Sequence, residues 1–404
     1  MKKLKLNLTN KDIRAHIQLP ASKSISNRAL ILNALAYSPY DIQNLSDCDD
    51  TRVLIQALDS NDNHFDIGAA GTSMRFLTAF LSKTAGEWTI TGSERMKNRP
   101  IRILVEALNQ LGARIEYIEK EGFPPLRIWG SALTGGEISL DGGVSSQYIS
   151  ALMMIAPFMM NGLKIKLTGN IISMPYIRMT MTMMQNFGVK TRFANNVISI
   201  DPQGYSPIKY RVESDWSAAS YWYEFMSIAG KGKIFLQGLK TQSTQGDSRV
   251  SGLFEQLGVQ TTYVHEGVVL TPNGHYCTKF EYDFTDQPDL AQTVAVTCCI
   301  RNIHFIFSGL QSLKIKETDR VAALIAELRK LGYVLHEPAE GMLAWEGRAC
   351  QPRKQISIST YEDHRMAMAF APTAILHELI IEEPGVVSKS YPSFWKDIDS
   401  LPEK

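Results

Sequence analysis

Cysteine is scarce in this sequence, and its distribution excludes the common cysteine-based architectures. Only five of the 404 residues are Cys. Their number is odd, two of them are adjacent at positions 298 and 299, and no Cys-x-x-Cys spacing occurs. Free thiols in a reducing compartment fit this pattern better than a disulfide framework does. The eight His residues show no metal-ligand spacing either, so we expect no metal site.

Long hydrophobic runs are also missing. The longest run, residues 151–160, reaches about half the length needed to span a bilayer and contains a Pro. Residues 1–9 alternate in the manner of a strand and lack the apolar core of a signal peptide. We therefore expect a soluble, cytoplasmic protein without a membrane partner.

An excess of charge of either sign is absent as well. Lys and Arg number 42 against 41 Asp and Glu, which gives a formal net charge of +1, and the basic residues form no long block. Nucleic acid and anionic membranes are therefore poor candidates for the main partner. Any basic binding site has to be assembled by the fold.

The chain does contain one repeated sequence motif. About every seventy residues, a cluster of polar residues precedes an apolar run of helical composition. The first series of these starts lies at residues 22–24, 71–73, 145–147, 215–217, 288–289 and 363–365. A second series, each with a central Arg, interleaves with it at residues 51–53, 101–103, 177–179, 248–250 and 319–321. Four helices of the second series are expected to close on a Leu-Gly or Phe-Gly pair, at residues 111–112, 187–188, 257–258 and 331–332.

The spacing of these motifs predicts an α/β fold built from repeated units. Short alternating stretches such as residues 163–167 and 303–307 separate the helices, so each repeat reads approximately β-α-β-α-β-β. Repeats of this length exceed the roughly 20–45 residues of solenoid units. A chain of 404 residues is expected to form two domains, and six repeats divide into three and three. The first repeat looks trimmed near residues 59–66, because its helix starts at 52 and 102 lie closer together than later ones.

Cations concentrate at the same helix starts, and this indicates an anion-binding site. A helix N-terminus opened by Ser, Thr or Gly presents free N–H groups and a positive dipole end, which suit phosphate or carboxylate. Helix capping alone would account for any one of Ser22, Thr72 and Ser145, but not for the cations beside them. Those cations are Lys23, Arg28, Arg75, Arg99, Lys316, Arg320, Arg365 and Lys389.

Two carboxylates stand out as candidates for proton transfer. Asp289 and Glu317 each lie at a helix start beside hydroxyl or basic neighbours. A plain capping role for Glu317 is the alternative. For His364, a solvated linker position is as consistent with the sequence as a functional one.

Several of these motifs resemble those of one enzyme family. The run Ala-Ser-Lys-Ser-Ile-Ser-Asn-Arg-Ala-Leu at 21–30 resembles the first signature of the 5-enolpyruvylshikimate-3-phosphate (EPSP) synthase family, and Lys-Glu-Thr-Asp-Arg at 316–320 resembles the second. Further motifs follow in family order over essentially the whole chain. They lie at residues 71–75, 97–101, 145–148, 175–176, 288–289, 363–368 and 388–392.

The resemblance implies a fold and a reaction. The fold is two inside-out α/β domains that close on the substrates, each built from three β-α-β-α-β-β units, with one domain from residues 20–214 and the other from 1–19 plus 215–404. The reaction transfers the enolpyruvyl group of phosphoenolpyruvate to the 5-hydroxyl of shikimate 3-phosphate and releases phosphate. It requires no metal and no organic cofactor, and we expect a monomer.

The resemblance also implies residue roles. Catalytic roles fall to Asp289, Glu317 and Lys23. Contacts to shikimate 3-phosphate are implied for Lys23, Ser24, Arg28, Ser145, Ser146, Gln147, Ser173, Tyr176, Asp289, Ser312 and Lys316. Contacts to phosphoenolpyruvate are implied for Lys23, Gly71, Arg99, Gln147, Arg320, Arg365 and Lys389. The chain departs from the family pattern at Ala69, Ser312 and Lys314.

Two other functions compete with this interpretation. A sister enolpyruvyl transferase acts on a UDP-linked amino sugar, but it typically has Lys-Asn where this chain has Lys23-Ser24 and carries a Cys in the loop matching residues 94–99, where this chain has none. A non-catalytic anion-binding protein would be favoured by loss of the acid, base or arginine positions, all of which are present.

Overall fold

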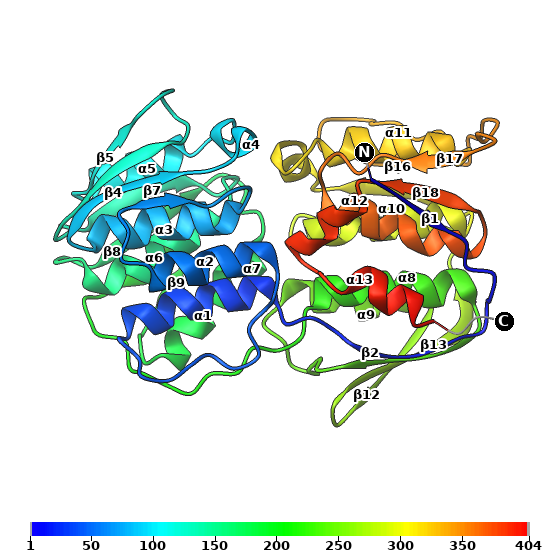
Figure 1. The fold of residues 1–404 in the computed structure, drawn as a ribbon, viewed down its shortest axis with the longest axis horizontal. Helices are drawn as coiled ribbons and strands as arrows, with labels where there is room; N and C mark the ends of the chain where they lie inside the picture. The colour runs from blue at the N-terminus through cyan, green and yellow to red at the C-terminus, as the bar shows by residue number, and fades with distance from the viewer. Residues whose placement is uncertain (1, 402–404) are drawn as a thin grey trace. The chain divides into compact units, whose positions relative to one another are not determined.

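The computed structural model describes residues 2–401, and the chain forms two compact units. The continuous unit spans Ala21–Val212, and the discontinuous unit combines Met1–Pro20 with Glu213–Lys404. Figure 1 shows both units, with labels on helices and strands of each. Each unit has its own hydrophobic core, so each is described by itself.

Among the described residues, the discontinuous unit contains three sheets, with strand orders β12-β13-β11-β2, β14-β15-β16 and β1-β18-β17. Each sheet holds one parallel pair, β2 with β11, β14 with β15 and β17 with β18, and antiparallel neighbours complete it. The strands are β1 (Lys3–Leu6), β2 (Ile13–Gln18), β11 (Gly232–Gln237), β12 (Leu257–Val264), β13 (Gly267–Tyr276), β14 (Lys279–Asp283), β15 (His304–Ser308), β16 (Leu343–Trp345), β17 (Ile356–Ile358) and β18 (Leu379–Glu382).

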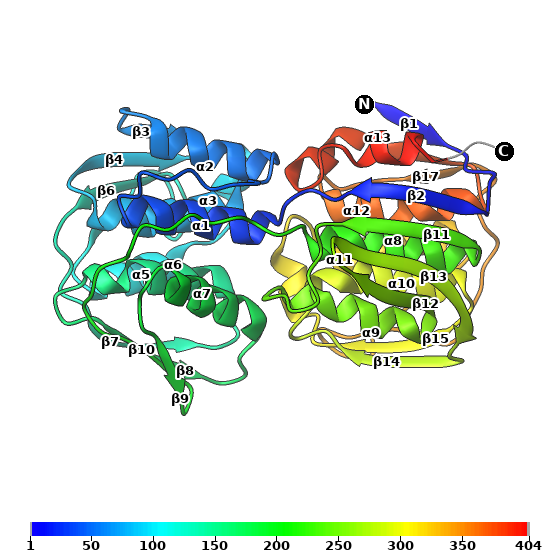
Figure 2. The same ribbon diagram turned by 90° about the horizontal axis from the view of Figure 1, so that it is seen from below.

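Helices α8, α10 and α12 of this unit are buried on nearly all sides, because their apolar residues do not keep to one face. Sheets therefore lie outside them, as Figure 2 shows for β2, β11 and β13 beside α8. The helices are α8 (Trp216–Ala229), α9 (Val250–Glu255), α10 (Ala291–Ile300), α11 (Arg320–Lys330), α12 (His364–Phe370) and α13 (Phe394–Asp399), with 3-10 turns η2 (Gly246–Arg249), η3 (Pro288–Leu290), η4 (Gln311–Ile315), η5 (Ala371–Ile375) and η6 (Pro384–Lys389).

In the continuous unit, as far as it is described, two sheets have the orders β3-β4-β6-β5 and β7-β8-β10-β9. Their parallel pairs, β3 with β4 and β7 with β8, match those of the other unit. The strands are β3 (His64–Asp66), β4 (Gly86–Thr91), β5 (Arg114–Tyr117), β6 (Leu126–Gly130), β7 (Gly136–Asp141), β8 (Leu163–Thr168), β9 (Arg192–Ala194) and β10 (Val197–Ile200). The helices are α1 (Lys23–Leu35), α2 (Asp49–Asp59), α3 (Gly71–Lys83), α4 (Glu94–Lys97), α5 (Arg102–Gln110), α6 (Ser146–Ile155) and α7 (Met174–Asn186), with the 3-10 turn η1 (Ala156–Phe158).

The first repeat of the continuous unit consists of α1 and α2 without a sheet of its own. Helix α2 ends at Asp59 and β3 begins at His64, so the connection is too short to hold a hairpin. An isolated parallel bridge joins Gln43 and Arg211 in this unit. The mixed α/β fold is as predicted, with this repeat reduced to its helices.

The predicted helix starts correspond closely to the observed ones. Helices α1, α3, α6, α8 and α12 begin within their predicted polar clusters, and α10 follows η3 directly. The prediction for residues 257–258 was wrong in detail: α9 already ends at Glu255, and Leu257 is the first residue of β12. Helix α9 is short because β12 pairs with β13 from this point, and that pairing removes the residues of a final helical turn.

Candidate active site

Arg320, the first residue of α11, is buried and contacts carboxylates from three other positions in the discontinuous unit. Its Nε donates to Oδ2 of Asp363 at 2.7 Å, Nη1 to Oδ1 of Asp289 at 3.0 Å and Nη2 to Oε2 of Glu317 at 2.9 Å. Burial alone would lower the pKa of Arg320, but these carboxylates, led by Asp363, raise it above its ordinary value. The guanidinium therefore stays charged, and its ion pairs link the N-terminal ends of α10, α11 and α12.

Asp289 bridges two arginines. It lies in η3, directly before α10, and its Oδ2 accepts from Nη2 of Arg365 at 2.8 Å while Oδ1 faces Arg320. Nη1 of Arg365 also donates to the main-chain oxygen of Asp289 at 3.2 Å. Two guanidinium groups thus stabilise the ionised carboxylate and fix its direction.

Glu317 lies between η4 and α11 and contacts two cations. Its Oε1 is 2.7 Å from Nζ of Lys389, the last residue of η6, and its Oε2 faces Arg320. The alternative that Glu317 merely caps α11 is wrong, because Asp319 fills that role by accepting from the N–H of Ala322 at 3.0 Å. Glu317 is instead an acid held between an arginine and a lysine.

Lys316 and Ser312 are the remaining predicted residues in this unit. Lys316 is partly buried, and burial lowers the pKa of its ammonium group, with Asp289 acting in the opposite direction. A lysine with a lowered pKa gives up its proton more readily. Ser312 lies in η4, four positions before Lys316, and is also partly buried.

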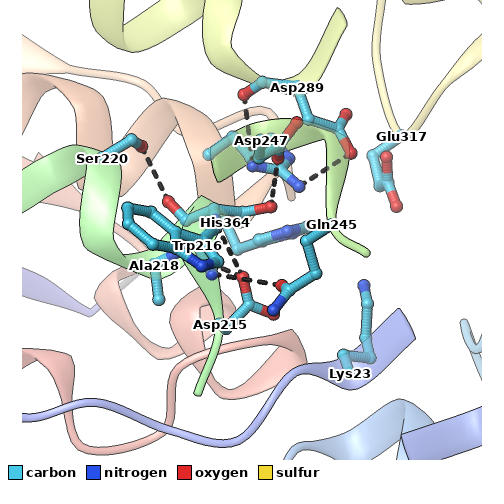
Figure 3. Close-up of polar contacts among 12 residues, drawn as sticks. Lys23, Asp215, Trp216, Ala218, Ser220, Gln245, Asp247, Asp289, Glu317 and His364 are labelled. Carbon is cyan, nitrogen blue, oxygen red and sulfur yellow. Dashed lines mark hydrogen bonds and ion pairs between the residues drawn. The ribbon is translucent and has the colours of Figure 1, made fainter. Parts of the chain in front are cut away.

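Asp247 is an acid that the sequence did not single out. It is buried in η2, and the hydroxyl of Ser217 donates to its Oδ2. Burial raises the pKa of Asp247 to about 7, and the negative charge of Asp289 adds to the shift. Figure 3 shows Asp247 beside Asp289. In the sequence, Asp247 directly precedes the predicted helix start of the second series at residues 248–250.

His364 also belongs to this group. The interpretation as a solvated linker residue is wrong, because His364 is buried at the start of α12, with Nδ1 3.8 Å from Oδ1 of Asp363. Asp363 was missed as a site residue, although it stood in a predicted helix start. It caps α12 by accepting from the N–H of Arg365 at 2.9 Å.

In the continuous unit, Arg28 of α1 is buried without an ion-pair partner among the residues that the structure describes. It donates to the hydroxyls of Thr180 and Ser150 at 2.7 and 3.0 Å and to the main-chain oxygen of Ser24 at 2.9 Å. Its guanidinium also lies 5.9 Å from the ring centre of Tyr176. Burial lowers the pKa of Arg28 to about 10, so it remains a cation at neutral pH.

Gly71 opens α3 at a point where two arginines approach the backbone. A Cβ at this position would lie 2.5 Å from Nη1 of Arg99 and 3.0 Å from Nη1 of Arg75. Arg75 donates to the main-chain oxygen of Gly71 at 2.9 Å. The Nε of Arg99 is buried without a hydrogen-bond partner within residues 2–401. This start of α3 therefore combines backbone N–H groups with cations.

The helix starts of this unit differ in how they are capped. Ser145 caps α6 by accepting from the N–H of Gln147 at 3.3 Å, as the capping interpretation holds. Ser22 does not cap α1, and the N-cap of α3 is Ala70, whose side chain cannot accept a hydrogen bond. Thr72 instead accepts from Nε2 of Gln147 at 3.2 Å. The N–H groups of α1 and α3 are therefore available to an anion.

The other predicted residues of the continuous unit lie on α1, α6 and α7. Lys23 begins α1, with Nζ 3.8 Å from Oδ2 of Asp50 on α2. Ser146 is the first residue of α6 and is buried. Ser173 precedes α7 in a left-handed conformation with φ 55°, and Tyr176 follows in the first turn. Sequence reasoning missed Ser150, Thr180 and Asp50, whose roles are visible only as contacts of Arg28 and Lys23.

Within residues 2–401, the structure has no helix with the length and apolar character needed to cross a membrane. The described part of the chain also has no cluster of three or more His, Cys, Asp or Glu side chains suited to hold a metal ion.

Two α/β units whose helix starts gather arginines, lysines and carboxylates are typical of an enzyme that acts on small anionic substrates. The chain belongs to the EPSP synthase (3-phosphoshikimate 1-carboxyvinyltransferase) family, whose model matches residues 8–60 and 55–398. This confirms the family predicted from the motifs.

Relatives of the same name cover nearly the whole chain. A 3-phosphoshikimate 1-carboxyvinyltransferase from Bacteroides fragilis (strain YCH46) is 56% identical over 388 residues, which cover 96% of this chain and 95% of that protein. One from Haemophilus influenzae (strain PittGG) is 35% identical over 424 residues, with 96% of each chain covered. The solved EPSP synthase of Acinetobacter baumannii has the same fold, with a TM-score of 0.79 at 19% identity over 99% of this chain and 98% of that one.

Proposed function

We infer that this chain has 3-phosphoshikimate 1-carboxyvinyltransferase activity in aromatic amino-acid biosynthesis. It transfers the enolpyruvyl group of phosphoenolpyruvate to the 5-hydroxyl of shikimate 3-phosphate and releases inorganic phosphate. The observation that carries this conclusion is the 56% identity to a protein of that name along 96% of the chain.

The reaction needs an acid and a base at separate atoms. The 5-hydroxyl oxygen bonds to the phosphate-bearing carbon of phosphoenolpyruvate while the methylene carbon gains a proton. The methyl group so formed then loses a proton as phosphate leaves, which restores the double bond. We assign the hydroxyl proton to Asp289 and the carbon proton to Glu317, with Lys23 as a further proton carrier. The contacts of Asp289 and Glu317 with Arg320 support the assignment, since they fix both acids relative to one cation.

The substrates explain the number of cations. Phosphoenolpyruvate carries a carboxylate and a phosphate, which favour planar arginine forks and helix-end N–H groups. We propose that it is held by Lys23, Gly71, Arg99, Gln147, Arg320, Arg365 and Lys389. For shikimate 3-phosphate we propose Lys23, Ser24, Arg28, Ser145, Ser146, Gln147, Ser173, Tyr176, Asp289, Ser312 and Lys316. The buried charge of Arg28 and the uncapped starts of α1 and α3 support these sets.

The activity is tested by phosphate release from the purified protein. Phosphoenolpyruvate is supplied with shikimate 3-phosphate in one reaction and with UDP-N-acetylglucosamine in a second. Release in the first reaction alone is expected. Release only in the second would assign the chain to the sister transferase, and release in neither would contradict enolpyruvyl transfer to either acceptor.

The assembly and compartment are part of the same proposal. We propose a cytoplasmic monomer, and five cysteines without a disulfide between them in the structure are compatible with a reducing compartment. Size-exclusion chromatography with light scattering measures the mass directly, and a mass twice that of the 45.2 kDa chain would contradict the monomer.

A further inference from the structure

Helix α11 holds one short segment of the discontinuous unit at two places. The segment, residues 359–363, joins β17 to α12. Arg320 at the start of α11 binds Asp363, and Glu327 binds Ser359 and Tyr361. Seven residues separate Arg320 from Glu327, which is about two helical turns, so both side chains leave the same face of the helix.

Every oxygen of the Glu327 carboxylate is used in this arrangement. The side chain is fully buried, and its Oε1 accepts from the hydroxyl of Tyr361 at 2.7 Å. Its Oε2 accepts from the N–H of Ser359 at 3.1 Å and from Nζ of Lys330 at 2.5 Å. Lys330 in turn donates to the main-chain oxygen of Ser357 at 2.9 Å. The buried ion pair of Glu327 and Lys330 thus holds the main chain at Ser357 and Ser359 in place.

The segment needs such an anchor because it is strained. Tyr361 and Glu362 both have left-handed backbones, with φ 54° and 55°. A left-handed conformation is unfavourable for a residue other than glycine, because its Cβ comes too close to the following carbonyl oxygen. The turn closes through the N–H of Asp363, which donates to the oxygen of Thr360 at 2.8 Å. Burial, followed by the contact with Glu327, raises the pKa of Tyr361, so its hydroxyl stays a donor.

The strained turn leads directly into the site. Both carboxylate oxygens of Asp363 accept hydrogen bonds from the guanidinium of Arg320, at 2.7 and 3.3 Å. Asp363 also caps α12 by accepting from the N–H of Arg365. A relaxed turn would therefore shift the carboxylate on which both arginines depend. We propose that Glu327 is a positioning residue, which sets Arg320 and Arg365 for the anionic substrate by holding Tyr361 and Ser359.

The proposal rests on the proposed function, since Arg320 and Arg365 are assigned there to phosphoenolpyruvate. Steady-state kinetics of Glu327→Gln and Tyr361→Phe test it. The expected result is a rise in KM for phosphoenolpyruvate of about tenfold for E327Q and about threefold for Y361F. The tenfold rise corresponds to a loss of about 1.4 kcal/mol in binding free energy. KM for shikimate 3-phosphate should stay within about twofold, because Asp289 is one of eleven proposed contacts of that substrate, whereas both arginines are assigned to phosphoenolpyruvate.

Ser357→Ala provides the matched control. Ser357 lies in β17, next to the same segment, and its hydroxyl donates to Oε1 of Glu382 at 2.7 Å. The substitution removes a contact of similar burial and leaves Glu327, Tyr361 and Asp363 in place, and Glu382 keeps its second contact, the hydroxyl of Ser359 at 2.8 Å. A general loss of stability would affect all three variants, whereas a loss of positioning affects only E327Q and Y361F.

A second readout does not depend on turnover. Amide hydrogen exchange over residues 359–365 should increase in E327Q and Y361F and stay unchanged in S357A. An unchanged KM for phosphoenolpyruvate in folded Y361F, or an equal rise in S357A, would overturn the proposal. A wild-type protein that releases no phosphate would overturn the proposed function instead, while unchanged exchange in Y361F would still refute the anchoring by Glu327.

Discussion

Two kinds of arginine occur at the candidate site. Arg320 has three carboxylate neighbours, whereas Arg28 is buried among hydroxyls, a main-chain oxygen and aromatic rings. A buried charge without a counter-ion is costly. The charge of Arg320 is therefore balanced by carboxylates of the chain itself, whereas the charge of Arg28 would be balanced best by an anion from outside the chain.

Gly71→Ala should weaken binding of phosphoenolpyruvate. Because the new methyl group would lie 2.5 Å from Nη1 of Arg99, the guanidinium must move away from the start of α3. We expect KM for phosphoenolpyruvate to rise about tenfold, a change of 1.4 kcal/mol, with a smaller effect on shikimate 3-phosphate. Initial-rate kinetics measure both. Gly252→Ala is the control, since no atom lies within 4 Å of a Cβ there, and an equal effect in this variant would contradict the argument.

Asp289→Ala should reduce turnover far more than it reduces affinity for shikimate 3-phosphate. A positioned acid or base contributes about 10²–10⁴-fold to a rate, and Asp289 is held in place by Arg320 and Arg365. Rapid-quench measurement of the chemical step separates turnover from binding. An exposed carboxylate changed in the same way, Glu281→Ala, should leave the rate unchanged. A wild-type rate in the Asp289 variant would remove this residue from the mechanism.

The sequence predicts the cations of the site better than their partners. Arg320 and Arg365 could be predicted because they stand at helix starts, a local pattern, whereas Lys389 is the last residue of η6. Asp363 and Glu327 could not be assigned their roles, because Asp363 lies 43 residues from Arg320 and Glu327 lies 34 residues from Tyr361. Such contacts are created when helices and strands pack, and no local spacing contains them.

At the scale of the element, α8 carries a buried acid for which the residues that the structure describes offer no hydrogen bond. Glu224 is fully buried, and neither carboxylate oxygen has a hydrogen-bond partner among the described residues. Desolvation raises its pKa well above the ordinary value. Folding therefore favours the protonated form of a group that is ionised in the unfolded chain at neutral pH.

Glu224→Gln should flatten the pH dependence of stability. Because the pKa is raised in the folded state, the wild-type protein is favoured at low pH and loses stability as pH rises above the unfolded value of about 4.3, by up to about 1.4 kcal/mol per pH unit. The variant carries no such group. Urea midpoints between pH 5 and 8 should therefore fall more steeply for the wild type. Glu255→Gln, at an exposed position of α9, controls for the change of charge, and parallel curves for wild type and Glu224→Gln would contradict the prediction.

Helix starts could be predicted from the sequence because capping is local, as Asp215 and Asp319 show by accepting from N–H groups two or three residues ahead. The sheets were harder to predict. Strand β1 pairs with β18, at the other end of the chain, and β2 pairs with β11 across more than two hundred residues. Alternation indicates a strand but not its partner.

At the scale of the whole molecule, the two units differ in how the chain completes them. The continuous unit, Ala21–Val212, contains all the strands of its own sheets. The discontinuous unit depends on residues 1–20, because β1 and β2 each form the edge of a sheet whose other strands follow residue 213. Leu6, Ile13, Ile17 and Leu19 from this segment belong to its core.

These differences predict how fragments behave. A fragment of residues 21–212 should fold and unfold cooperatively, whereas residues 213–404 alone should not. Each buried Leu or Ile contributes about 1.5–3 kcal/mol, so the loss of four approaches the 5–15 kcal/mol that stabilises a typical domain. Joining residues 1–20 after residue 404 through a flexible linker should restore folding. Circular dichroism and urea titration of the three proteins measure this, and a cooperative transition in residues 213–404 without the added segment would show that β1 and β2 are dispensable.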